Sequence, residues 1–319
     1  MRVGGFARFA WGVLAYDLAV VAWGAYVRAT GSGAGCGRHW PLCNGEIVPQ
    51  SPKTQTLVEL SHRVSSGVAL VLAAALLVWA LRAFPRGHLV RKGAAVGMGL
   101  MLMEAGIGAA LVLFELVAHD ASMKRALSVS LHLGNTFLLL AVTALTAWWA
   151  SGGAHPSVRG QRAVVPLLAV PLVAMFFVGA SGAITALGDT LFPPSSLAAG
   201  LAQDLAPGAH AFIRLRALHP LLASLTAGVI VVASGLVRAL RPSKAVRVLS
   251  RVAAVLAIAQ VAAGLLDVAT LAPVWLQLVH LVMADAVWVA LVLLAAAALA
   301  CEPSAVHSQS AVEAVTARP

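Results

Sequence analysis

GAYVRATGSGAGCGRHWPLCNGEIVPQSPKTQTLVELSHR, residues 24–63, joins two apolar segments through a polar loop. The loop carries Cys36 and Cys43, and the second apolar segment opens with Glu59 and His62, three residues apart. Residues three apart share one face of a helix. Ionisable side chains in a membrane-spanning segment are costly and usually functional. The stretch therefore predicts a membrane fold and one of its functional sites.

The composition is that of a membrane protein. Of 319 residues, 60% are hydrophobic and only 11% are charged, with a mean hydropathy of +0.90, whereas a soluble domain carries about 25% charged residues. The net charge of +10 does not indicate nucleic-acid binding, because the excess cations lie in short loops between apolar segments and no nucleic-acid motif accompanies them. We predict an all-α polytopic membrane protein.

Eight runs are long and apolar enough to cross the bilayer core, which takes about 20 residues. The first is too long for the apolar core of a signal peptide, which has about 7–15 residues, so we expect it to be the first span. The eight runs are residues 9–28, 58–82, 93–114, 128–150, 163–187, 214–237, 247–270 and 277–300.

An even number of spans puts both termini on one side, and the basic residues indicate which side. Of the 22 Lys and Arg, 14 lie on the side of the termini and 8 on the other. The positive-inside rule then predicts a multi-pass protein of the cell membrane with both termini in the cytoplasm. The long loops 29–57 and 188–213 face outward on this topology. We expect the tail 301–319 to be disordered and Cys301 to be a free thiol.

The chain repeats itself at about half its length. The pattern at 24–37 recurs at 179–192, LVELSHR at 57–63 recurs as RLRALHP at 214–220, and the pattern at 131–142 recurs at 279–292. Because each half has an even number of spans, the copies keep the same orientation, as in a parallel repeat. We predict two tandem pseudo-symmetric four-helix bundles, residues 1–150 and 163–300, joined by a cytoplasmic linker at 151–162.

Four of the ten histidines fall at matched positions of the repeat, at the outer ends of spans 2, 4, 6 and 8: His62, His132, His219 and His280. Two histidines on facing helices of a bundle can ligate a haem iron axially, so we predict one haem site per half. The alternative is that they are interfacial histidines bonded to the backbone or to lipid headgroups. No role is predicted for five of the remaining histidines: His88, His119, His155, His210 and His307.

The halves differ three residues before the first histidine, where one has Glu59 and the other Arg216. A carboxylate beside a haem could move protons or stabilise developing positive charge, so we predict the reaction centre in the N-terminal half. The alternative is an acid favoured by the helix dipole. Cys36 and Cys43 lie in an outward, oxidising loop and predict a structural disulfide; a redox-active dithiol, or a metal clip with His39, are the alternatives.

Other charged residues lie at or within the spans. Four arginines gather at the outer ends, where they could bind haem propionates or simply snorkel to the interface: Arg28, Arg63, Arg214 and Arg216. Asp17 and Asp267 lie within spans and are expected to face the interior, without a partner that the sequence identifies.

Gly31-Ser-Gly, then Cys36 to Trp40-Pro-Leu-Cys43-Asn-Gly, then Glu59-Leu-Ser-His62-Arg, resemble the haem A synthases, bacterial membrane enzymes related to the mitochondrial Cox15 proteins. The resemblance covers nearly the whole chain. It implies oxidation of the C8 methyl group of haem O to a formyl group, by successive hydroxylations, giving haem A for terminal oxidases.

The resemblance also implies residue roles. Glu59 matches the essential acid, His62 and His132 the ligands of the substrate-side haem, and His219 and His280 the ligands of haem b. Cys36 and Cys43 match a loop pair found in one branch of the family. Two residues depart from the pattern, Glu104 where glutamine is expected and His39 in the loop.

Two other functions stay open, a non-catalytic dihaem electron carrier of b type and a transporter built on the parallel repeat. The transporter would need broken helices and polar residues at mid-membrane, whereas the polar cluster here lies near the outer face. The expected partners are haem O, membrane lipid, a haem O synthase and an electron-transfer protein, with no nucleic acid. A homo-oligomer is neither required nor excluded.

Overall fold

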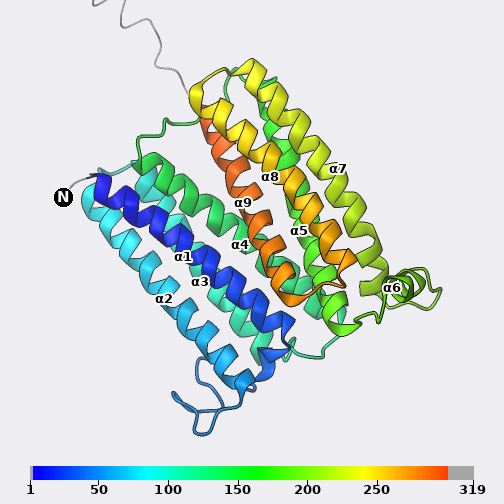
Figure 1. Ribbon diagram of the computed structural model, residues 1–319. Helices are drawn as coiled ribbons and strands as arrows, with labels where there is room; N and C mark the ends of the chain where they lie inside the picture. The colour runs from blue at the N-terminus through cyan, green and yellow to red at the C-terminus, as the bar shows by residue number, and fades with distance from the viewer. Residues whose placement is uncertain (1–2, 301–319) are drawn as a thin grey trace, which may run out of the picture.

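The computed structural model describes residues 3–300, which form nine α-helices and one short 3₁₀ helix, without a strand in that range (Figure 1). Eight of the helices are long and apolar enough to cross a membrane, which confirms the all-α polytopic fold. The predicted tail and Cys301 lie outside the described residues. The helices are α1 (Val3–Ala29), η1 (Ser32–Ala34), α2 (Thr54–Ala83), α3 (Leu89–Leu113), α4 (Met123–Ala150), α5 (Val164–Leu191), α6 (Leu197–Asp204), α7 (Ala211–Leu240), α8 (Lys244–Ala269) and α9 (Val274–Ala298).

Seven of the eight spans begin three to six residues earlier than the predicted apolar runs, and α5 begins one residue later. The Ser122 side chain accepts from the backbone of Arg125 at the start of α4, and Ser243 does the same for Val246 at the start of α8. Such caps satisfy N–H groups that have no partner inside the helix. The prediction that 188–213 is a loop is wrong in part, since α5 continues to Leu191 and α6 lies within it.

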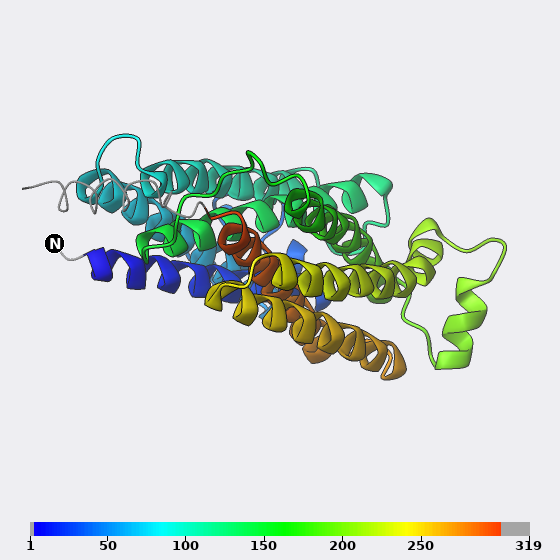
Figure 2. The ribbon, with the colours of Figure 1, turned by 90° about the horizontal axis from the view of Figure 1, so that it is seen from above.

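Helices α1–α4 pack together, as do α5 and α7–α9, and the two groups meet where α4 and α9 pack side by side. Figure 2 shows α9 between the α1–α4 group and the α7–α8 pair, with α6 standing apart. The first and last described helices begin and end at one end of the molecule (Figure 1). We call the opposite end, which carries the loop at 30–53 and α6, the disulfide end.

The two groups share one apolar core. The largest buried cluster draws on both, and in it the ring of Phe137 on α4 stacks on Trp288 on α9, with centroids 5.0 Å apart. The indole N–H of Trp288 also donates to the Phe137 carbonyl at 2.6 Å. At the disulfide end, Arg28 on α1 donates to the Ala186 carbonyl on α5 at 2.6 Å and to Gln277 on α9 at 2.9 Å. The halves are therefore joined both in the core and at one end.

Candidate functional site

The four repeat-matched histidines lie on α2, α4, α7 and α9, the four spans that run away from the disulfide end. In each half the two histidine-bearing helices pack on the other two helices but not extensively on each other, so they face one another across a bundle. His62 and His132 thus lie on facing helices of one bundle, and His219 and His280 on facing helices of the other. Each half of the chain therefore carries its two repeat-matched histidines on opposite helices of one bundle.

Glycines on flanking helices lie against three of these rings. A Cβ placed on Gly24 would stand 2.9 Å from Cε1 of His62, one on Gly182 would stand 3.1 Å from Cε1 of His219, and one on Gly264 would stand 2.9 Å from Cε1 of His280. The two contacts of 2.9 Å would require something to shift, and the contact of 3.1 Å would require the ring to move by a few tenths of an ångström. Both halves therefore have a glycine on their first helix, α1 or α5, that leaves space beside the first histidine.

The ring nitrogens are largely unengaged by the protein, which fits the residues to a haem. All four histidines are half-buried, and in the described chain Nδ1 of His62 and of His280 has no hydrogen-bond partner. His219 bonds the Ser181 hydroxyl, with 2.9 Å between Nδ1 and Oγ. No backbone group bonds any of the four rings within residues 3–300, so the expectation of histidines held by backbone groups gains no support.

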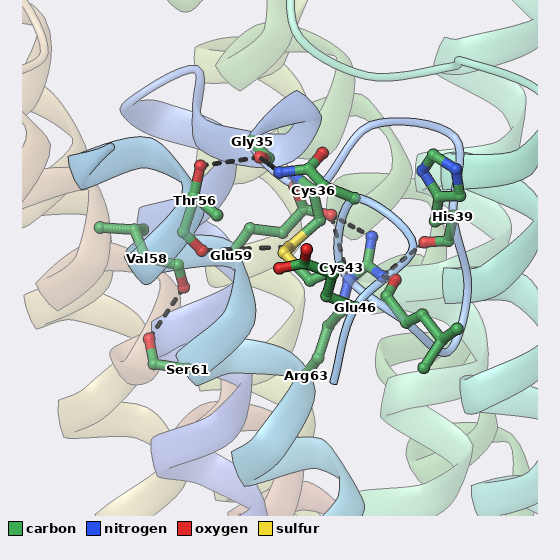
Figure 3. Close-up of a disulfide and its surroundings, with 12 residues drawn as sticks. Gly35, Cys36, His39, Cys43, Glu46, Thr56, Val58, Glu59, Ser61 and Arg63 are labelled. Atoms are coloured by element: carbon green, nitrogen blue, oxygen red, sulfur yellow. Dashed lines mark hydrogen bonds and ion pairs between the residues drawn. A yellow bond between two sulfur atoms is a disulfide. The ribbon is translucent and has the colours of Figure 1, made fainter. Parts of the chain in front are cut away.

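Glu59 lies one turn before His62 on α2, and its carboxylate is fully engaged. Oε2 accepts the backbone N–H of Cys36 at 2.8 Å, and Oε1 lies 2.5 Å from Nη2 of Arg63, four residues later on the same helix. Glu59 is 3% exposed. An acid this buried persists only when paired and hydrogen-bonded, and here both needs are met (Figure 3).

The loop above Glu59 is closed by the predicted disulfide, Cys36–Cys43, which the structure confirms. Arg63 donates to the carbonyls of His39 and Leu42 inside that loop, at 2.6 and 2.7 Å (Figure 3). Gly35 packs so tightly on α2 that a Cβ there would overlap the Gln55 carbonyl oxygen. The Glu59–Arg63 pair therefore fixes the disulfide loop over the start of α2.

In the second half, the position equivalent to Glu59 carries a positive charge, Arg216, which is held by carboxylates. Arg216, three residues before His219, lies 2.6 Å from Asp204 on α6 and 3.2 Å from Asp189 at the end of α5. It also donates to Gln203 at 3.0 Å. The carboxylates that hold Arg216 were not foreseen, because they lie 12 and 27 residues away in the chain. The predicted propionate role gains no support for Arg63 and Arg216, whose guanidinium groups bind protein carboxylates.

Glu104 on α3 lies beside His132. Its Oε1 is 3.3 Å from Nδ1 of that ring, within ion-pair distance although not aligned as a hydrogen bond. Two residues one turn after His132 hold the carboxylate: the Thr136 hydroxyl donates to Oε1 at 2.5 Å and the Asn135 amide donates to Oε2. The sequence singles out Glu104 as a departure, but not its two donors.

Three other acids lie inside the spans. Asp17 on α1 and Asp285 on α9 are 3% and 0% exposed, and none of their carboxylate oxygens has a hydrogen-bond partner in the described chain. Asp17 lines a cavity of about 10 Å³ with Met101 and Thr143, room for about one water molecule. Asp267, like Asp17, has a buried oxygen without a partner in the described residues. The interior position expected for Asp17 is confirmed; Asp285 was missed.

The sequence of most of the chain matches a family of known proteins. The family model COX15-CtaA, described as cytochrome oxidase assembly protein, matches residues 7–292. The chain belongs to the COX15-CtaA family.

Two kinds of relative of this COX15-CtaA family member match it. A protoheme IX farnesyltransferase of Thermus thermophilus is 52% identical over 293 residues, 92% of this chain but 48% of the relative. Heme A synthases match over shorter stretches. That of Geobacillus kaustophilus is 41% identical over 97 residues, which are 30% of this chain and 31% of the relative. That of Staphylococcus saprophyticus is 37% identical over 106 residues, which are 33% of this chain and 35% of the relative. The chain thus spans about half the length of its Thermus relatives and about a third of the heme A synthases.

Proposed function

We propose that this COX15-CtaA family member is a haem A synthase, an oxidoreductase that converts the C8 methyl group of haem O to a formyl group by successive hydroxylations. The observation that carries the proposal is the position of His62 on α2 and His132 on α4, which face each other across the N-terminal bundle, with the buried Glu59 one turn before His62 on α2. The family and the names of the heme A synthase relatives support the same activity.

In this proposal the two halves have different tasks. His62 and His132 would hold haem O, the substrate, while His219 and His280 would hold haem b. Haem iron supplies the redox chemistry when bound. The protein positions the substrate: Glu59 and Arg63 hold the disulfide loop over the outer end of the site, and the space beside Gly24 admits the His62 ring. We propose residues 1–150 and 163–300 as the two functional halves.

The Thermus relatives suggest a source for the substrate. Their name describes farnesyl transfer to protohaem IX, and this chain covers only about half of them. We propose that an enzyme of that kind, a haem O synthase, passes its product to this chain inside the cell membrane, with both termini of this chain in the cytoplasm. The eight apolar spans fit a membrane setting, in which a farnesylated haem would partition.

The test is to express the chain with a haem O synthase in a host that makes no haem A, and to identify the pigments by chromatography and mass spectrometry. Haem A, or its hydroxylated precursor, should appear only when this chain is present. His62→Ala should abolish it, whereas His119→Ala, an exposed histidine on the same side of the molecule, should leave it unchanged. Unchanged haem O with both histidine sites loaded would reject the synthase.

A non-catalytic dihaem electron carrier of b type is the second candidate, and one observation favours it. Because Glu59 is tied to Arg63 and to the backbone of Cys36, its presence can be explained without catalysis. The same pigment analysis separates the two: a carrier would hold haem b, reduce and reoxidise reversibly, and leave haem O unmodified.

A further inference from the structure

Glu104 and the two side chains that hold it form a group found in only one half of the molecule. In the repeat, Glu104 corresponds to Gln260, and the donors Asn135 and Thr136 correspond to Met283 and Ala284. In the C-terminal half an amide therefore stands in place of the acid, and two residues whose side chains cannot donate stand in place of its two donors. A carboxylate without donors would be costly inside a span, so the three residues form one unit.

Hydrogen bonds between α3 and α4 hold the three residues of the unit in place. Asn135 donates to the Leu100 carbonyl at 3.0 Å as well as to Oε2 of Glu104, which fixes it between α3 and α4. Thr136 donates to Oε1. With both oxygens accepting, the carboxylate is held in place with Oε1 turned to Nδ1 of His132, 3.3 Å away. A small rotation of the ring would align the N–H with it.

The opposite half has a weaker arrangement. The Gln260 amide nitrogen lies 3.3 Å from Nε2 of His280 and donates to the His280 carbonyl at 2.9 Å, while Oε1 of Gln260 has no partner in the described chain. A neutral amide does not make a ring more basic as a carboxylate does. Histidines that bind metals commonly donate their other N–H to a carboxylate or carbonyl, which fixes the tautomer and raises ligand basicity.

We propose that Glu104 is a positioning residue for His132. It accepts a hydrogen bond from Nδ1–H, which leaves Nε2 free to bind iron, and it makes the His132 imidazole a more basic iron ligand than the histidines of the other half. This inference rests on the proposed haem-binding function. A more basic ligand favours ferric over ferrous iron, so the N-terminal haem has the lower midpoint potential of the two.

The experiment is a redox titration of the purified, haem-loaded protein, followed by absorbance and by electron paramagnetic resonance. Glu104→Gln copies the other half and should raise the potential of one haem only. Changes to residues that orient metal ligands commonly alter affinity about 10–100-fold, and a tenfold change in the relative binding of ferric and ferrous iron is about 59 mV for one electron. Thr136→Val, which removes one donor at constant size, should give a smaller rise.

Thr143→Val is the matched control, a buried threonine further along α4 that has no hydrogen bond to Glu104 in the described chain, and it should leave both potentials unchanged. Equal potentials in wild type and Glu104→Gln would overturn the inference while leaving the haem sites intact. If Glu104→Gln does not assemble, Thr136→Val decides, and no shift in that variant counts against the inference. Wild-type protein that binds no haem would instead reject the proposed function.

Discussion

Oε1 of Glu59 lies 2.5 Å from Nη2 of Arg63, one turn later on α2, with the two side chains 4% and 12% exposed. This pair connects α2 to the disulfide loop. Glu59 also accepts the backbone N–H of Cys36, and Arg63 also donates to the carbonyls of His39 and Leu42. Whatever chemistry Glu59 performs, its removal also changes the structure around it.

Glu59→Ala should destabilise the protein by about 3–5 kcal/mol, because it leaves Arg63 as a buried charge without its partner. Thermal unfolding in detergent measures the loss. Glu115→Ala is the control, since Glu115 and Arg38 form an exposed pair with side chains 61% and 69% exposed, and such pairs contribute about 0–1 kcal/mol. Equal unfolding temperatures for Glu59→Ala and wild type would show that the pair does not hold the loop.

Reduction of the disulfide should loosen the same loop. Closing a loop of this length stabilises a protein by about 2–3 kcal/mol, and the Cys36 N–H that Glu59 accepts lies within it. We expect dithiothreitol to lower the unfolding temperature and to expose the loop to protease. The double variant Cys36→Ser/Cys43→Ser should unfold at the lower temperature with or without the reductant. A reductant effect that persists in the double variant would place the sensitivity elsewhere.

Gly24→Ala should displace the His62 ring, because the added methyl would stand 2.9 Å from Cε1. Overpacking of this kind costs about 1–3 kcal/mol, and the amount of haem bound per protein should fall. Gly12→Ala on the same helix is the matched control, since nothing lies within 4 Å of a Cβ there. Haem content, measured as the pyridine haemochrome, should be lower in Gly24→Ala than in Gly12→Ala. Equal haem content would mean that the His62 ring can shift without losing its ability to bind haem.

Asp285→Leu should raise the unfolding temperature. Its carboxylate is 0% exposed and neither oxygen has a hydrogen-bond partner in the described chain, and an apolar replacement for an unsatisfied buried polar group is often neutral or stabilising. Haem content and activity should be unchanged. A variant that is more stable but inactive would instead reveal a functional acid inside α9.

The spans and the disulfide could be predicted because each depends on a local or periodic signal. About twenty apolar residues specify a span wherever they occur, and a repeat places equivalent residues at equivalent depths. The loop contacts are different in kind. The Arg63 carbonyl partners, His39 and Leu42, depend on the path of a loop without regular structure, which no periodicity describes.

Helix α6 was missed for a related reason. It has only eight residues, too few for a periodic signal, and its clearest sequence mark is the cap, where the Ser196 side chain accepts from Ala199. The Asp204 carboxylate at its end becomes meaningful only once α6 folds back to Arg216. The role of Asn135 and Thr136 was likewise invisible, because their partner Glu104 lies on another helix.

The stack of Phe137 on Trp288 bears on how such a molecule could be divided. In the repeat the counterpart of Trp288 is Leu140 and that of Phe137 is Asp285. Two identical halves would meet through a self-complementary surface, whereas here each partner of the stack has been replaced in the other copy. The contact between the halves therefore depends on residues that differ between the two copies. A half expressed alone could not rebuild this contact with a second copy of itself, and only the two different halves, supplied together, carry both rings.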